Sequence, residues 1–219
     1  MIENRARILD AAARVYAEFG YRGATTRRIA VAAGVNEVTL FRTFGSKAAL
    51  LDEAMRSCAE SASAIRGPLP DVPVDPEAEL TEWATAVLTH LRTQRSIIRK
   101  TMSELEERPE LGPCLSSGMR FAGDDLRAYL RRVDEAGLLE PAEGEAGRPV
   151  ARDETTCAAG TMLLSALFAD AMGREMMPGI YPEPADRAPA TYVRLFLRAI
   201  GCVLRPRRRT RPTSRSSRS

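Results

Sequence analysis

Apolar residues recur along most of the chain at intervals of three or four positions, the period of an α-helix with one buried face. The first such stripe runs from Ile8 to Phe19, and Gly20 and Gly23 follow it as residues that commonly end helices. Alanine is abundant, and runs of β-branched residues are scarce. The pattern therefore predicts an all-α protein.

Two short helices are predicted next, each beginning at a side chain that can cap free backbone N–H groups. Thr25 precedes a helix that Gly34 ends, and Asn36 precedes a second helix that runs to about Phe44. Ser46 is then expected to cap a longer helix whose apolar positions keep helical spacing for several turns. This segment thus predicts two short helices between two longer ones.

Proline and glycine divide the rest of the chain. Gly67–Pro76 and a loop around Pro178–Pro189 are too rich in proline for a helix interior, and Pro141–Pro149 reads as a polar loop. Arg205–Ser219 has nothing to bury and is expected to be disordered. Between these breaks the spacing of apolar residues predicts five further helices: Glu77–Arg95, Ile97–Glu107, Leu115–Ala136, Cys157–Met172 and Thr191–Leu204.

Charge is distributed unevenly along the 219 residues, whose net charge is +3. Residues 1–47 carry eight Lys or Arg and four acids, the tail from Arg205 carries seven Arg and no acid, and residues 48–204 are net negative. A basic end on an acidic body is typical of a polyanion-binding module joined to a part with another task. We therefore divide the chain into a binding domain (1–47), a helical domain (48–204) and a tail (205–219). The Arg-rich tail either contributes to nucleic-acid binding or, as we expect, is a solvated terminus with at most nonspecific affinity for phosphate.

The second short helix has two distinct faces. Leu40 and Phe44 are four residues apart and share the face that must be buried, so Val38 and Arg42 point outward. A helix held by one face, with an arginine and small apolar groups on the other, suits insertion into the major groove of DNA. A plain pair of helices in a helical protein has the same periodicity, so the pattern alone leaves both interpretations open.

The stretch TTRRIAVAAGVNEVTLFRTFGSKAAL resembles the N-terminal DNA-binding domain of the TetR family of bacterial transcriptional regulators. In that family a three-helix domain carries T-x-x-x-I-A-x-x-A-G-V, a recognition helix ending in T-L-Y-x-H-F, and a Ser-Lys start to the fourth helix. The resemblance covers roughly residues 3–66. Phe41 replaces the usual Tyr, Thr43 stands where His is common, and Val38 where a smaller residue is usual. The residues that match in register are Thr25, Ile29, Ala30, Ala33, Gly34, Val35, Thr39, Leu40, Phe44, Ser46, Lys47 and Leu50.

The resemblance implies a helix-turn-helix over residues 25–44 and a repressor that a small-molecule effector releases from a palindromic operator in double-stranded DNA. Thr25 and Lys47 would lie at helix N-termini on phosphates. The residues expected to contact DNA are Thr25, Thr26, Arg27, Arg28, Asn36, Glu37, Val38, Thr39, Phe41, Arg42, Thr43 and Lys47.

Such a regulator needs a two-fold dimer, because one domain grips only a few base pairs. The last two predicted helices are more apolar than a helix needs to be in order to pack against its own chain. The resemblance implies that they form the interface of a homodimer; alternatively, they close the core of a monomer. The expected interface residues are Leu163, Leu167, Phe168, Met172, Val193, Phe196, Leu197, Ile200 and Leu204.

The middle helices are then expected to form an effector pocket, since methionine and aromatic side chains suit adaptable apolar sites. Each of the candidates can equally be an ordinary core residue. The candidate lining residues are Trp83, His90, Met102, Leu105, Met119, Phe121, Tyr129 and Met162.

Catalytic chemistry is not indicated. His90 is the single histidine, and neither GxSxG nor a phosphate-binding loop is present, so we expect no enzyme, no cofactor and no metal site. The alternative function is that of a helical interaction protein that binds no DNA. Charged residues and glycines interrupt the apolar stretches, and Met1–Asn4 leads into charged sequence, so we expect neither a membrane span nor a signal peptide. A cytoplasmic protein with four free, mostly buried cysteines is expected, with redox sensing as the alternative.

Overall fold

The computed structural model describes residues 2–64, 69–139 and 152–202. Within these ranges the chain forms nine α-helices and one short 3-10 helix, and an isolated bridge between Leu139 and Cys202 is the sole β pairing. The all-α prediction is therefore confirmed. The elements are α1 (Ile2–Gly23), α2 (Thr26–Ala33), α3 (Glu37–Phe44), α4 (Lys47–Ala64), α5 (Pro76–Thr93), α6 (Arg95–Glu104), η1 (Pro109–Leu111), α7 (Gly112–Glu135), α8 (Arg152–Gly173) and α9 (Ala188–Ala199).

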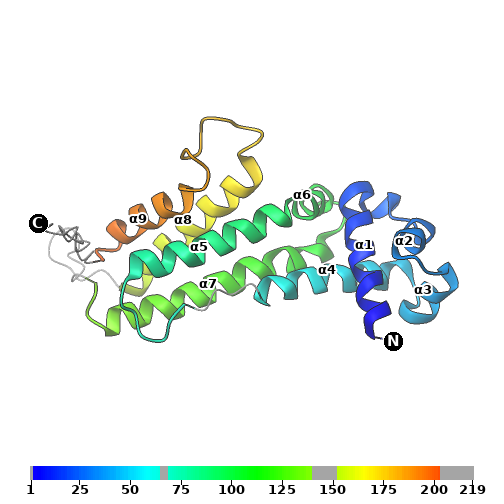
Figure 1. Cartoon of the computed structure of the whole chain (residues 1–219), viewed down its shortest axis with the longest axis horizontal. Helices are drawn as coiled ribbons and strands as arrows, with labels where there is room; N and C mark the ends of the chain where they lie inside the picture. Colours follow the sequence, from blue (N-terminus) through cyan, green and yellow to red (C-terminus); the bar gives the residue numbers. More distant parts are fainter. Residues whose placement is uncertain (1, 65–68, 140–151, 203–219) are drawn as a thin grey trace, which may run out of the picture.

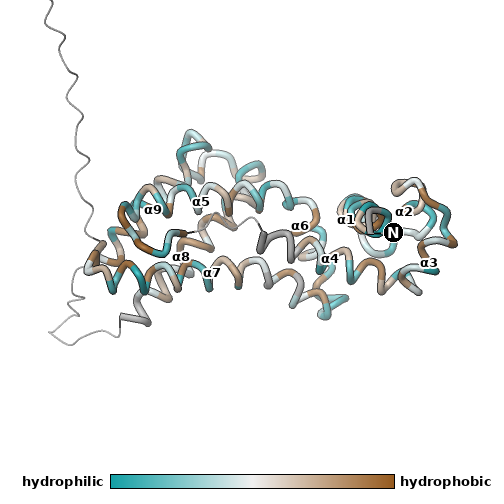
Figure 2. The backbone as a smooth tube through the Cα atoms, turned by 60° about the horizontal axis from the view of Figure 1, so that its bottom comes forward, coloured by the Kyte–Doolittle hydropathy of each residue, from teal (hydrophilic) through white to brown (hydrophobic). Residues whose placement is uncertain are grey.

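The molecule is elongated, with α1, α2 and α3 at one end (Figure 1). Helix α4 leads from this end toward the larger bundle of α5, α7, α8 and α9, and α6 lies where the two parts meet. Helix α1 packs against α2, α4 and α6, whereas α5 packs against α8 and α9. Figure 2 shows hydrophobic and hydrophilic residues alternating along most helices, as expected for helices with one buried face.

The helix caps predicted from the sequence are present. The Thr25 side chain accepts a hydrogen bond from the backbone N–H of Arg28 at 3.2 Å. Asn36 Oδ1 accepts one from the N–H of Val38 at 2.9 Å, and Ser46 caps α4 in the same way. Because each cap acts within three residues, short-range sequence signals are enough to fix where α2, α3 and α4 begin.

Helix α1 is interrupted at Gly20, as its role as a stop signal predicts. Its φ of 67° lies in the left-handed region that side chains other than glycine disfavour. A Cβ at this position would also overlap the side chains of Lys100 and Glu104 on α6. Glycine is therefore required here for the turn, whereas the flexible ends of Lys100 and Glu104 could move aside.

Several helix boundaries differ from the prediction, mainly because proline fits the first turn of a helix. Pro76 begins α5 although it is predicted to end a break, and α7 begins at Gly112, before the predicted Leu115, with Pro113 in its first turn. Gln94 separates α5 from α6, and α8 begins at Arg152, earlier than predicted. The last helix spans Ala188–Ala199, so it is shifted toward the N-terminus.

Three predicted segments fall wholly or partly outside the described residues. These are the first two positions of Gly67–Pro76, the loop Pro141–Pro149 and the tail Arg205–Ser219. Leu204, which is expected at the dimer seam, also lies outside them.

The helices enclose two clusters of buried apolar side chains, one in each part of the molecule. The first includes Leu40 and Phe44 of α3 together with residues of α1, α2 and the first half of α4. Ile97 of α6 joins this cluster, and Ile98 packs against both. The start of α4 therefore packs with the N-terminal helices, while the border predicted between residues 47 and 48 stays a prediction.

Helices α8 and α9 direct most of their predicted interface residues into the chain's own core. Phe168 and Ile200 pack partly against this core. The expected interface stays a prediction, and these side chains leave little surface for a second chain because they are already buried within one. The outward apolar side chains on these helices are Met162 and Leu195, 72% and 60% exposed. The buried interface candidates are Leu163, Leu167, Met172, Val193, Phe196 and Leu197.

One window of α8, Thr156–Gly173, is long and apolar enough to cross a membrane by length and composition. This corrects the expectation that every apolar stretch is too short. Half of the window is buried within the structure, where α8 packs against α5, α7 and α9. The core helix of a folded domain has the same composition, so the window by itself is weak evidence for a span.

Candidate DNA-binding surface and effector cavity

Helix α3 has the two faces that its sequence predicts. Leu40 and Phe44 are buried, at 1% and 9% exposure, and they hold α3 against the N-terminal core. Val38 is 71% exposed, Phe41 is 49% exposed, and Arg42 is exposed as well. The outward face of α3 is therefore available to a large partner, and the inward face is fixed by packing.

Helices α2 and α3 are joined by polar contacts at their N-termini. The Thr26 hydroxyl donates a hydrogen bond to the Glu37 carboxylate, which links the first residue of α2 to the first residue of α3. The Thr43 hydroxyl donates to the backbone carbonyl of Thr39 at 2.7 Å. These contacts occupy groups that the sequence assigns to DNA, so Thr26 and Glu37 also position the helix pair.

The cations of this region fall into two groups. Arg28 stacks on the Phe19 ring and donates to the carbonyl of Gly23, so its position is fixed by the chain itself. Arg27 and Arg42 are exposed and make no hydrogen bond or ion pair with the described residues. These two guanidinium groups are the ones that a polyanion can reach without breaking an internal contact.

Lys47, at the start of α4, lies in a cluster with Tyr21 and Arg108. Its Nζ lies 4.5 Å from the centroid of the Tyr21 ring and 3.5 Å from the carbonyl oxygen of Arg22. Burial, with the nearby charge of Arg108, lowers the pKa of Lys47. The lysine therefore has partners within the chain as well as a place at a helix N-terminus.

The structure places eleven of the twelve expected DNA contacts on α2, α3 and their N-caps, and the twelfth, Lys47, at the start of α4. Val31 of α2 is also exposed, at 78%, although sequence periodicity alone does not single it out. The exposed members are Thr25, Arg27, Arg28, Asn36, Val38, Phe41 and Arg42, and the half-buried ones are Thr26, Glu37, Thr39, Thr43 and Lys47.

A cavity of about 110 Å³ lies among five helices of the larger part of the molecule. Helix α5 contributes a stripe at helical spacing, α6 and α7 form further walls, and α8 contributes Phe168. Met55 and Cys58 of α4 complete the lining. The remaining lining residues are Trp83, Val87, His90, Leu91, Gln94, Ile97, Ile98, Thr101, Leu115, Gly118, Met119, Phe121, Ala122 and Asp125.

Four of the eight candidate pocket residues line this cavity: Trp83, His90, Met119 and Phe121. The other four do not, for different reasons. Tyr129 is fully buried in the core, where its hydroxyl donates to Glu79. Met102 and Met162 are 45% and 72% exposed, and Leu105 lies beyond the end of α6, beside Gly112.

A polar contact connects the cavity side of α6 to the N-terminal helices. The Glu104 carboxylate, at the end of α6, accepts hydrogen bonds from the Tyr16 hydroxyl at 3.0 Å and from the backbone N–H of Tyr21 at 2.9 Å. Burial raises the pKa of Tyr16 to about 12, and Glu104 adds to that shift, so the hydroxyl remains a donor. Ile97 and Thr101, earlier on α6, line the cavity. One helix therefore touches both the cavity and α1.

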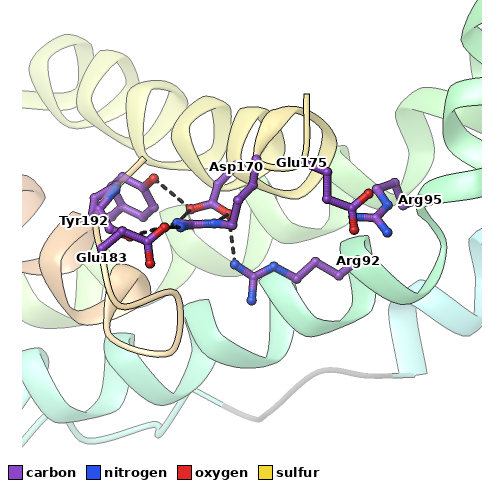
Figure 3. A network of polar contacts seen from close by, with 8 residues as sticks. Arg92, Arg95, Asp170, Glu175, Glu183 and Tyr192 are labelled. Carbon is purple, nitrogen blue, oxygen red and sulfur yellow. Dashed lines mark hydrogen bonds and ion pairs between the residues drawn. The ribbon is translucent and has the colours of Figure 1, made fainter. Parts of the chain in front are cut away.

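A second polar network fixes α8 and α9 relative to α5 (Figure 3). Asp170 is fully buried and accepts hydrogen bonds from Arg92 of α5 at 2.9 Å, from Arg174 and from the Tyr192 hydroxyl of α9 at 2.9 Å. Burial alone would raise the pKa of Asp170, but the hydrogen bonds from Arg174, Arg92 and Tyr192 outweigh it and hold the pKa below its usual value. Arg174 also pairs with Glu183 at 2.8 Å.

Sequence reasoning did not identify this network. The available signal was a single carboxylate within the apolar stretch of α8, followed by an arginine four residues later. A charge in such a position is rarely left buried without a partner.

The cysteines and potential metal ligands are spread over the fold. Cys58 is half-buried and Cys202 is buried, and burial raises the pKa of both thiols. Cys157 is exposed, and the side chain of Cys114 lies outside the described residues. Among the described residues, no three His, Cys, Asp or Glu side chains are grouped as a metal ion would need.

Comparison with known proteins connects this geometry to a family. The sequence profile described as bacterial regulatory proteins, tetR family, matches residues 8–54. YvkB of Bacillus subtilis, an uncharacterized HTH-type transcriptional regulator, is 33% identical over 134 residues, which are 61% of this chain and 69% of that protein.

Solved structures share the fold over most of the chain. A protein classed with the TetR-family transcriptional regulators of Mesorhizobium loti has a TM-score of 0.70 at 18% identity, with 91% of this chain and 98% of that one covered. PfmR, a TetR-family transcriptional regulator of Thermus thermophilus, has a TM-score of 0.61 at 24% identity, with 88% and 97% covered. At these identities the likeness bears on the fold alone.

Proposed function

The chain belongs to the TetR family of bacterial regulatory proteins, and on this premise we propose that it is a dimeric repressor released from its operator by a small molecule in the cavity. DNA-binding transcriptional regulation is the function of the family. Repression, dimerisation and effector release are typical of its members. The proposal extends these properties to named surfaces of this chain, and it places the protein in the cytoplasm, where it can reach the chromosome.

The observation that carries the proposal is the exposed face of α3. Leu40 and Phe44 fix the helix from within, which leaves Val38, Phe41 and Arg42 on the outside. A short helix presented in this way can enter the major groove, where Arg42 reaches base edges or neighbouring phosphates. Arg27, on α2, is available for the phosphate backbone.

Specific binding calls for two copies of this surface. In a two-fold dimer of helix-turn-helix proteins, the two recognition helices lie about 34–36 Å apart, one turn of DNA. We assign the seam to the outward sides of α8 and α9, which carry Met162 and Leu195. The Asp170 network supports this assignment because it holds α9 against α5 and α8 and so fixes the shape of the surface that a partner meets.

The position of the cavity offers a route from effector to DNA. Met55 of α4 and Ile97 of α6 line the cavity and also belong to the N-terminal core. A ligand that separates these two side chains must move α4 or α6, and α4 directly follows the recognition helix. Such a ligand releases DNA only if it binds more tightly to the conformation in which the two recognition helices no longer fit adjacent turns of the DNA.

Footprinting of the purified protein on the DNA upstream of its own gene tests this function. We expect a protected site with two-fold symmetry whose halves are one helical turn apart. The rival function, a helical interaction protein without DNA binding, predicts no competed, salt-sensitive protection at any site. Members of this family are in general not enzymes, and we propose no catalytic role for this chain.

A further inference from the structure

The lining of the cavity limits the charge of what can bind there. Most of the described side chains that line it are apolar, and neither lysine nor arginine is among them. Asp125 is the one acidic residue in this described lining, and it is already engaged in an interaction within the chain. An anionic ligand would therefore meet a carboxylate and no counter-charge, and a cation would have to compete for an occupied partner.

One polar side chain in the lining, that of His90, carries an atom without a partner among the described residues. The Nδ1 atom of His90 is buried and has no hydrogen-bond partner among the described residues. Such atoms are rare, because a buried polar group without a partner costs free energy. Burial lowers the pKa of His90, so the imidazole is neutral at neutral pH. A neutral ring nitrogen pairs well with a hydroxyl group, which can act as donor or acceptor.

We infer that the cavity binds an uncharged, mostly apolar molecule of about one ring in size, whose hydroxyl group hydrogen-bonds to the imidazole of His90. This inference rests on the proposed function, since it specifies the effector of the same regulator. The size follows from the volume of about 110 Å³. For comparison, an apolar cavity of about 150 Å³ in another protein binds benzene. Gln94, one turn from His90 on α5, also lines the cavity and can bind the same polar end.

The chain carries its own reporter for this test. Trp83 is its single tryptophan, and it lines the cavity, so a bound ligand changes its fluorescence. Four probes share a cyclohexyl ring and do not absorb with tryptophan: cyclohexylmethanol, ethylcyclohexane, cyclohexanecarboxylate and cyclohexylmethylamine. They differ in the group at the end of the substituent on the ring, which is a hydroxyl, a methyl, an anionic carboxylate or a cationic ammonium.

Two comparisons are made with these probes on the full-length protein. In the wild type we expect cyclohexylmethanol to bind at least about tenfold more tightly than the carboxylate or the amine. Ethylcyclohexane leaves water more readily than cyclohexylmethanol, so the affinities of these two probes for one protein are not compared directly. Instead, the affinity of each probe is compared between the wild type and the variant. His90→Leu is expected to weaken binding of the alcohol about tenfold and to leave ethylcyclohexane bound as tightly as before. Thr89→Ala, an exposed neighbour on the same helix, should change neither.

The inference is overturned if a charged probe binds as tightly as the alcohol, or if His90→Leu affects the alcohol and the alkane equally. A melting curve of each variant confirms that the cavity is still folded. The same proteins are then assayed on the footprinted DNA, which separates the two proposals. If the protein protects specific DNA but does not show the expected selectivity among the probes, this inference alone is overturned. If it shows the expected selectivity but binds no specific DNA, the proposed function alone is overturned.

Discussion

The face of α3 and the cavity use the same kinds of side chain in opposite ways. On α3, Val38 and Phe41 are apolar yet exposed, and Arg42 beside them makes no hydrogen bond or ion pair with the described residues. In the cavity, most of the described lining is apolar, and His90 carries a ring nitrogen that has no partner among the described residues. A surface that meets a polyanion keeps its cations in solvent until the partner arrives. A cavity for a small molecule can instead contain a polar group without a hydrogen-bond partner. A ligand that binds this group removes the free-energy cost of leaving it unpaired.

The largest effect is expected in the bundle that encloses the cavity. Asp170→Ala removes the acceptor shared by Arg92, Arg174 and Tyr192, and losing one side of a buried charged pair should lower the free energy of unfolding by about 4 kcal/mol. Urea unfolding measures this loss. Glu183→Ala removes the ion pair with Arg174, in which the Glu183 side chain is 64% exposed, and should lower the free energy of unfolding by less than about 1 kcal/mol. Equal losses in the two variants would contradict the account.

The same carboxylate gives a dependence on pH. The pKa of Asp170 is held below its ordinary value of 3.8, so its contribution to stability is present above that pH and is lost as the pH falls through the folded-state pKa. The wild type should therefore lose stability below about pH 4 more steeply than Asp170→Asn. Parallel acid-unfolding curves for the two proteins would argue against an ionised Asp170.

In the DNA-binding part, the two faces of α3 should respond differently to alanine. Leu40→Ala creates a cavity in the N-terminal core and should cost about 3 kcal/mol of stability. Val38→Ala, two residues away and 71% exposed, should stay within about 0.5 kcal/mol of the wild type. Thermal melting distinguishes them, and a comparable loss in both would mean that the outward face is packed.

Arg42→Ala tests the outward face directly. Its removal should weaken operator binding by about 1–3 kcal/mol and relax the sequence preference if Arg42 reads a base. Mobility shifts on the footprinted operator and on mutated sites measure both effects. Arg120→Ala removes the same charge from an exposed position on α7 and should leave affinity unchanged.

The smallest effect is expected where the two parts meet. Glu104→Ala removes the acceptor for Tyr16 and Tyr21, at a cost of about 1 kcal/mol. A ligand that quenches Trp83 should still bind with the same affinity, yet several-fold more of it should be needed to release operator DNA. Glu107→Ala, whose partner Arg22 is on the surface, is the control, and matching release curves for both variants would exclude a coupling role for Glu104.

The N-terminal surface could be predicted because its determinants lie close together in the sequence. Thr25 and Asn36 cap helices within three residues, and the spacing of Leu40 and Phe44 alone fixes which face of α3 is outward. Each of these signals acts over a single helical turn. The structure adds the contact from Thr26 to Glu37, which spans two helices and has no local signature.

The cavity and the dimer seam could be predicted only in part, since both depend on how distant helices meet. The criterion that methionine and aromatic residues line the cavity selects Trp83 correctly, but it also selects Tyr129, whose ring lies in the core. The lining stripe of α5 includes Val87 and Gln94, which that criterion passes over. Likewise, the apolar character of α8 does not reveal that Leu163 faces inward while its neighbour Met162 faces out.

The most direct test of the account is a protection footprint with Val38→Glu beside the wild type. Position 38 is exposed, and a carboxylate in the first turn of a helix is well tolerated, so the variant should melt with the wild type. The new negative charge would face the phosphates of DNA, so the account predicts a symmetric footprint for the wild type and none for the variant. If Val38→Glu protects the same DNA at the same concentration, the outward face of α3 is not the surface that binds DNA.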